Sequence, residues 1–211
     1  MLYERRKKLL TRIKQRMQSL MASEARLAHN MGFTPNRLSA AGILFAVISS
    51  VMYWRWQSIP FSLLLAPLFL LASGYCDMLD GIIARTYGQV SSFGGFTDSL
   101  VDRYADAAVL GGIILGGLCS PFWGLTALIG SLLVSYARAR AEAEGVKMET
   151  KGLAERAERL IIIAAASFLE FFLSGIIGWA IILLAALTNI TVLQRATYFR
   201  KALHKKKMLV S

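Results

Sequence analysis

The sequence predicts an all-α integral membrane protein with six transmembrane helices and an N-terminal amphipathic helix at the membrane interface. Three observations lead to this prediction. Long apolar stretches run through a chain that is 55% hydrophobic, basic clusters recur on alternate connections, and basic and apolar residues alternate at helical spacing near the N-terminus. A helix needs about 20 mostly apolar residues to cross a bilayer. The length of 211 residues suits one domain of this kind.

Six stretches have the length and apolar character of spanning helices. They run roughly over Leu38–Trp56, Phe61–Arg85, Phe96–Cys119, Phe122–Ala141, Ala154–Phe172 and Gly175–Phe199. We therefore divide the chain into an interfacial segment 1–33, a six-helix transmembrane domain 34–200 and a basic cytoplasmic tail 201–211. Residues 4–29 read as the interfacial helix, with a solvated helix as the alternative. Thr34-Pro35 fits an N-cap followed by proline at the first helical position, which predicts where the first span begins.

The net charge of +11 is unevenly distributed. Lysine and arginine gather before the first stretch, after the last, and around the connection between the fourth and fifth, whereas the other connections are short and nearly uncharged. By the positive-inside rule, both termini of this multi-pass protein of the cell membrane are cytoplasmic. Anionic lipid headgroups explain the basic surplus, so we expect membrane lipids and no nucleic acid as partners.

Two smaller features concern packing and cysteine chemistry. Gly112 and Gly116 form a GxxxG motif, whose small residues let helices approach closely. The sequence leaves open whether the partner helix belongs to the same subunit. Cys76 and Cys119 lack the spacing of a disulfide framework or a thiolate metal site.

Four aspartates interrupt the second and third apolar stretches: Asp77, Asp80, Asp98 and Asp102. An ionisable residue at the centre of a membrane helix costs about 2.5–3.5 kcal/mol, so a cluster of one sign must be neutralised. Spacings of three and four put each pair on one helix face. Clustered carboxylates suit Mg²⁺, Mn²⁺ or Ca²⁺, and two-metal sites commonly serve displacement at phosphorus. The acids therefore predict a metal site facing the cytoplasm.

The residues around the acids favour a phosphate ligand. Gly81 and Ala84 lie one helical turn apart and leave room for a ligand, Arg85 offers a forked donor, and Gly94 follows a short connection. One alternative is an aspartate that pairs with arginine to orient helices, for which Asp102-Arg103 and Asp106 are the candidates. Another is a cation channel or transporter with an acidic site, which accounts for the acids but not for their small and basic neighbours.

The whole pattern resembles the complete signature of the CDP-alcohol phosphotransferases, since it reads Asp77-x2-Asp80-Gly81-x2-Ala84-Arg85-x8-Gly94-x3-Asp98-x3-Asp102. The resemblance implies a membrane enzyme, usually a homodimer, that displaces CMP from a CDP-linked alcohol with a second alcohol.

The same resemblance implies roles for individual residues. Two divalent cations, Mg²⁺ or Mn²⁺, would be held by Asp77, Asp80, Asp98 and Asp102. Asp102 would also be the catalytic general base, since adjacent cations favour its ionised form. The nucleotide would be bound by Gly81, Ala84 and Arg85, with Gly94 allowing close approach.

The acceptor alcohol is indicated by basic residues beyond the fourth stretch. Arginines that converge near the metal site would suit an acceptor that carries a phosphate, and positive-inside flanking is the alternative. Arg156 and Arg159 are three residues apart, and we expect one to face the pocket and the other the lipid headgroups.

This part of the chain is similar to bacterial phosphatidylinositol-phosphate synthases and archaeal archaetidylinositol-phosphate synthases. The similarity implies a CDP-lipid donor (CDP-diacylglycerol or CDP-archaeol) and inositol phosphate as acceptor, with the acceptor phosphate held by Arg138, Arg159 and Arg195. Bacterial members commonly carry lysine at the first of these positions. Glycerol 3-phosphate, as in phosphatidylglycerophosphate-type synthases, is the alternative acceptor.

Overall fold

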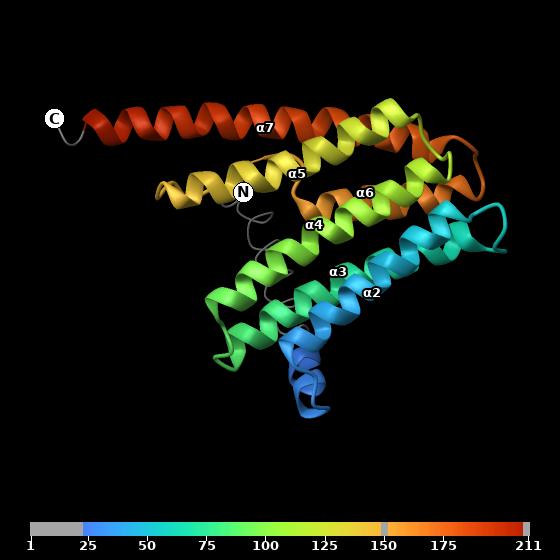
Figure 1. The fold of residues 1–211 in the computed structure, drawn as a ribbon, viewed down its shortest axis with the longest axis horizontal. Coiled ribbons are helices and arrows are strands. Elements are labelled where there is room, and N and C mark those ends of the chain that lie inside the picture. Colours follow the sequence, from blue (N-terminus) through green and yellow to red (C-terminus); the bar gives the residue numbers. More distant parts are fainter. Residues whose placement is uncertain (1–22, 149–151, 209–211) are drawn as a thin grey trace, which may run out of the picture.

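A computed structural model describes residues 23–148 and 152–208, and every regular element within these ranges is a helix (Figure 1). A short helix at 23–30 precedes six longer ones, which are α2 (Pro35–Trp54), α3 (Ser62–Thr86), α4 (Ser92–Leu115), α5 (Pro121–Ala143), α6 (Arg156–Glu170) and α7 (Ile176–Met208). The all-α prediction is confirmed for this part of the chain.

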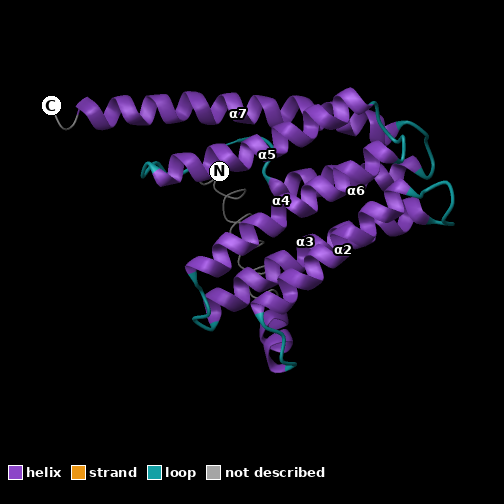
Figure 2. Cartoon of the chain, in the orientation of Figure 1, coloured by secondary structure: helices purple, strands orange, loops and turns teal. Residues whose placement is uncertain are grey.

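Successive helices run in opposite directions, so their connections gather at two ends of the molecule. Connections 55–61, 116–120 and 171–175 lie together at one end (Figure 2). The turn at 87–91 and the segment between α5 and α6 lie at the opposite ends of the same helices. This second end carries Arg138 and Arg140 on the last turns of α5 and Arg156 at the start of α6. Arg138, Arg140 and Arg156, three of the basic residues that we used to predict orientation, therefore share one end of the bundle.

Four helices are long and apolar enough to cross a membrane by length and composition, namely Pro35–Trp54, Ser62–Thr86, Pro121–Ala143 and Ile176–His204. The other two predicted spans fall short for different reasons. α4 carries four charged residues, namely Asp98, Asp102, Arg103 and Asp106. α6 has 15 residues, which span about 22 Å against a hydrocarbon core of about 30 Å. A membrane protein is supported, and the crossing of α4 and α6 stays a prediction.

The first long helix begins where the sequence predicts. Thr34 has an extended backbone, its side-chain oxygen accepts a hydrogen bond from the Arg37 N–H at 3.4 Å, and Pro35 occupies the first helical position. The helix at 23–30 packs its buried Ala25 against Leu38 and Ile83, at the meeting point of α2 and α3. The rest of the predicted interfacial helix lies outside the described residues.

The GxxxG motif joins two helices of the same chain. A Cβ atom at Gly112 would lie 2.3 Å from the Ser50 carbonyl oxygen, and one at Gly116 would lie 2.3 Å from the Tyr53 carbonyl oxygen. Only glycine allows α4 to approach the α2 backbone this closely. Trp56 then donates from Nε1 to the Gly116 carbonyl oxygen at 2.8 Å. This contact fixes α4, and with it half of the acidic motif, against α2.

Candidate active site and metal centre

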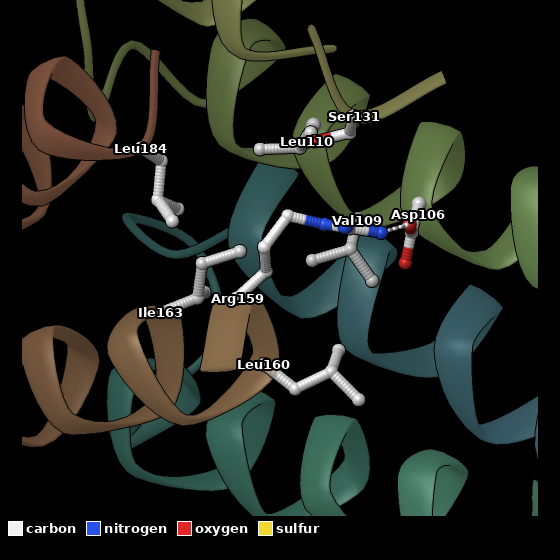
Figure 3. Close-up of a pocket in the computed structure, with 8 residues that line it drawn as sticks. All are labelled: Asp106, Val109, Leu110, Ser131, Arg159, Leu160, Ile163 and Leu184. Atoms are coloured by element: carbon white, nitrogen blue, oxygen red, sulfur yellow. Dashed lines mark hydrogen bonds and ion pairs between the residues drawn. The ribbon is translucent and has the colours of Figure 1, made fainter. Parts of the chain in front are cut away.

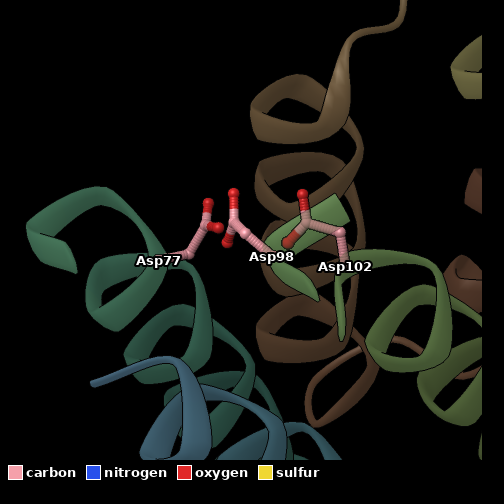
Figure 4. Close-up of side chains that lie close together, drawn as sticks. All are labelled: Asp77, Asp98 and Asp102. Atoms are coloured by element: carbon pink, nitrogen blue, oxygen red, sulfur yellow. The ribbon is translucent and has the colours of Figure 1, made fainter. Parts of the chain in front are cut away.

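Three of the four aspartates come together where α3 ends and α4 begins. Asp77, Asp98 and Asp102 each offer a carboxylate oxygen, and these oxygens lie within 4.8 Å of one another (Figure 4). The chain turns between the two helices at Gly88, whose φ of +65° is left-handed and favours glycine. As the spacing of the acids predicts, the acidic faces of α3 and α4 meet at one hollow.

The fourth acid, Asp80, lines the same hollow but stands apart from the trio. Its side chain is buried, and Ser39 on α2 donates from Oγ to Asp80 Oδ2 at 2.6 Å. Its charge still interacts with those of Asp77 and Asp98. Sequence reasoning missed Ser39, because it lies on another helix, 41 residues from Asp80, and no local pattern marks it.

Arg156 at the start of α6 is the counter-charge of the acidic cluster. Its Nη1 lies 2.7 Å from Asp77 Oδ2 and 2.6 Å from Asp102 Oδ1, and its Nε lies 3.5 Å from Asp106 Oδ1. The arginine side chain is 17% exposed. Among the described residues, Nε and Nη1 of Arg156 are the buried side-chain nitrogens that lack a partner with hydrogen-bond geometry. The guanidinium thus neutralises the acids at ion-pair distance without satisfying its own donors.

The donor set of this cluster fits divalent cations. Asp77, Asp98 and Asp102 supply hard carboxylate oxygens, and Asp80 adds a fourth carboxylate to the same hollow. One arginine cannot balance four clustered carboxylates, and its poorly directed contacts make it a weak substitute for a cation. The cysteines offer no thiolate alternative. Both are free and buried, and burial raises the pKa of the Cys119 thiol to about 11.

The predicted nucleotide residues lie on the two helix ends beside the acids. Arg85 folds its guanidinium back over Gly81, so that a Cβ at Gly81 would lie 3.2 Å from Arg85 Nη1. Ala84 is half-buried one turn further along α3, and Arg85 itself is exposed. Gly94 lies in the first turn of α4, and its N–H donates to Oγ of the N-cap residue Ser91 at 2.9 Å.

Arg159, predicted to bind the acceptor phosphate, is buried and faces the bundle interior. Its Nη2 forms an ion pair with Asp106 Oδ2, and its Nη1 donates to the Ala154 carbonyl oxygen at 3.2 Å (Figure 3). Arg156 also turns inward, so the expectation that one of the two faces lipid headgroups is wrong. Asp106 pairs with both arginines, since Oδ1 faces Arg156 and Oδ2 faces Arg159, one turn further along α6. The pairing with arginine considered for Asp106 is thus observed, and its role in orienting the helices stays a prediction.

The other two predicted acceptor residues come from α5 and α7. Arg195 is 2% exposed and donates from Nη1 to the Val134 carbonyl oxygen at 2.6 Å, with Glu155 Oε1 3.5 Å from Nη2. Arg138 pairs with Glu142 at 2.9 Å and is 43% exposed. The charges of Arg138 and Arg159 both act on the Arg195 guanidinium. Arg138 of α5 and Arg159 of α6 therefore each lie within electrostatic range of Arg195 of α7.

The segment before α6 is anchored beside these arginines. Thr191 Oγ1 accepts hydrogen bonds from the N–H groups of Leu153 and Ala154 at 3.1 and 3.2 Å. Gly152 has a φ of +141°, and a Cβ there would lie 2.4 Å from Thr191 Cγ2. No local pattern marks Thr191, since its role depends on how α7 packs against this segment.

The sequence of this chain is similar to those of known proteins. A sequence model of the CDP-alcohol phosphatidyltransferase family matches residues 33–191. The archaetidylinositol phosphate synthase of Pyrococcus horikoshii is 38% identical over 197 residues, covering 92% of this chain and 98% of the relative.

Two crystal structures of the Mycobacterium tuberculosis phosphatidylinositol phosphate synthase are also similar. One, with CDP-DAG bound, has a TM-score of 0.72 and 27% identity and covers 86% of this chain and 94% of the other. Another, in complex with manganese and citrate, has a TM-score of 0.71 and 28% identity and covers 85% and 88%. The family match covers both the acidic motif and the basic residues of α5 and α6, and this chain belongs to the CDP-alcohol phosphatidyltransferase family.

Proposed function

We propose that this protein transfers a phosphatidyl-type group from a CDP-lipid to inositol phosphate and releases CMP. The observation that carries the proposal is the cluster of Asp77, Asp98 and Asp102 beside Arg156, with the buried Arg159 one turn further along α6. The names of the relatives support the same acceptor, since they are synthases of inositol-phosphate lipids. Family membership also argues against the cation channel considered from the sequence.

The acidic cluster is the proposed metal centre. Asp77, Asp98 and Asp102, with Asp80 beside them, would hold two divalent cations, Mg²⁺ or Mn²⁺. When bound, such cations neutralise the pyrophosphate and stabilise the departing CMP. The related structure with manganese supports the choice of metal.

Asp102 is the proposed general base. A carboxylate oxygen of Asp102 takes the proton from the acceptor hydroxyl, and the hydroxyl oxygen then forms a bond to the lipid-side phosphorus. The bond between that phosphorus and the CMP oxygen breaks, and CMP carries away the electron pair. Asp102 Oδ1 lies 2.6 Å from Nη1 of Arg156, so this carboxylate faces α6, the helix that also carries Arg159.

The two substrates would enter from different sides of the acids. Gly81, Ala84, Arg85 and Gly94 surround the cytidine diphosphate on the α3–α4 side. Arg138, Arg159 and Arg195 hold the acceptor phosphate on the α5–α7 side. Arg159 and Arg195 are buried, so their charges are little screened by solvent and attract a phosphate strongly.

We further propose that α4 and α6 complete a six-span bundle, with both termini and the site on the cytoplasmic side. The short α6 packs against α3 and α7, and non-helical backbone at membrane depth is tolerated where it is buried in protein. The proposed homodimer rests on the family resemblance.

An acceptor panel tests the function. Purified protein is incubated with CDP-diacylglycerol or CDP-archaeol, Mn²⁺ and one acceptor at a time, and CMP release and the lipid product are measured. We expect release with inositol phosphate and little with free inositol, which lacks the phosphate. Faster release with glycerol 3-phosphate would assign the phosphatidylglycerophosphate-type reaction instead. Absence of CMP with every acceptor would contradict the enzyme.

A further inference from the structure

Arg156 occupies the position that a cation would take between two proposed metal ligands. Its Nη1 lies within 2.7 Å of both Asp77 Oδ2 and Asp102 Oδ1. A guanidinium and a divalent cation repel one another, so a cation bound to these oxygens disfavours Nη1 at its present position. If cations bind there, Nη1 must leave, and a buried guanidinium then needs another carboxylate in reach.

Asp106 is that carboxylate. Its Oδ1 already lies 3.5 Å from Arg156 Nε, and its side chain is 9% exposed against 22% for Asp102. Asp106 is one helical turn beyond Asp102 but does not line the hollow of the acidic cluster. It lines a neighbouring cavity with Arg159, to which it is paired (Figure 3). Arg156 thus lies between the acidic hollow and this cavity. It contacts Asp77 and Asp102 on one side and Asp106 on the other.

We propose that Asp106 is a positioning residue that holds Arg156 away from the metal ligands when divalent cations bind. This inference rests on the proposed metal centre. Asp106 touches no reacting atom in this account. It acts through Arg156, and its grip on Arg159 fixes the carboxylate so that it faces α6 instead of turning toward the cations.

The positioning role of Asp106 can be distinguished from a direct electrostatic effect of its negative charge on cation affinity. Replacing Asp106 with a neutral residue leaves Arg156 on Asp77 and Asp102, so cations must compete with it and bind more weakly. In a protein without Arg156, no guanidinium competes with the cations, so the same replacement should leave the cation affinity nearly unchanged. If Asp106 acted only through its negative charge, it would strengthen cation binding equally in both backgrounds.

The experiment measures Mn²⁺ binding to purified protein by electron paramagnetic resonance or calorimetry, without substrate. We expect Asp106→Asn to weaken binding about tenfold and Arg156→Gln to strengthen it about tenfold. Adding Asp106→Asn to Arg156→Gln should change the affinity less than about twofold. Asp106→Glu, which keeps the carboxylate, should restore most of the affinity. Arg140→Gln, at an exposed pair with Glu144, is the control and should leave it unchanged.

Equal weakening by Asp106→Asn in both backgrounds, or no weakening in either, would overturn the positioning role while leaving the metal centre in place. Absence of Mn²⁺ binding to the wild-type protein would instead overturn the metal centre and this inference together. Should Asp106→Asn fail to fold, Arg156→Lys provides the test. Lysine keeps the charge but lacks the Nε that Asp106 faces, so Mn²⁺ should bind more weakly, and unchanged or tighter binding would contradict the proposal.

Discussion

The Nη1 atom of Arg156 lies 2.6 Å from Oδ1 of Asp102. Oδ1 of the residue proposed as the general base is therefore occupied by a guanidinium donor and is closed to an acceptor hydroxyl. The base becomes available only after Arg156 has moved. Cation binding, which displaces Arg156, would thus precede activation of the acceptor hydroxyl.

Replacement of Arg195 tests the acceptor site. Arg195→Gln removes a buried charge that we place against the acceptor phosphate. A charge-assisted hydrogen bond contributes about 1.5–3 kcal/mol, so we expect the KM for inositol phosphate to rise about 10- to 100-fold while the KM for the CDP-lipid changes little. Steady-state CMP release measures both constants. Arg140→Gln, on the exposed surface of α5, should change neither. Equal rises in both constants would reject the role given to Arg195.

Gly81 tests the nucleotide side. Gly81→Ala would bring a methyl group to 3.2 Å from Arg85 Nη1, so the guanidinium must move from its position over Gly81. One extra methyl group in a binding pocket commonly changes specificity about tenfold or more, and we expect the KM for the CDP-lipid to rise by about that factor.

The matched control is Gly95→Ala, because a Cβ at Gly95 would meet no atom within 4 Å. It should leave both Michaelis constants near their wild-type values. If the two alanine variants behave alike, Gly81 is not in the nucleotide site.

The approach of α4 to α2 can be tested by stability. Gly112→Ala would place a Cβ 2.3 Å from the Ser50 carbonyl oxygen, so one of the two backbones must shift. Overpacking of this kind destabilises a protein by about 1–3 kcal/mol. Thermal unfolding in detergent should therefore show a lower Tm.

Its neighbour Gly111 is the control on the same helix, since a Cβ there would meet no atom within 4 Å. Gly111→Ala should be neutral or slightly stabilising, because alanine favours the helix by about 1 kcal/mol over glycine. A Tm that falls equally for both variants would mean that helix contact is not the reason for glycine at 112.

The helices of this protein follow from local signals, but their ends do not always coincide with the apolar stretches. The first long helix begins at Pro35 because Thr34 caps it. The third stretch was predicted to begin near Phe96, whereas α4 begins at Ser92, where Ser91 caps the helix outside the apolar region. α7 likewise continues to Met208, beyond the predicted end at Phe199, through residues that are polar but still favour helix.

The candidate site was predictable where its residues share a helix and unpredictable where they meet across helices. Asp98 and Asp102 lie on one face of α4 because their spacing requires it. The pairing of Ser39 with Asp80, and of Asp106 with Arg156 and Arg159, depends on how α2 and α6 are placed against α3 and α4. No periodicity encodes that register, so the sequence could mark Asp106 as a candidate for an ion pair but could not name its partners.

The most direct test of the account is CMP release from a CDP-lipid in the presence of inositol phosphate, compared between wild-type protein and Asp102→Asn. General-base catalysis commonly contributes about 10²–10⁴-fold, so turnover should fall by at least that factor while the protein stays folded and still binds the nucleotide. Glu158→Gln, at an exposed acid of α6, should keep wild-type activity. An Asp102→Asn protein that releases CMP at the wild-type rate would contradict the account.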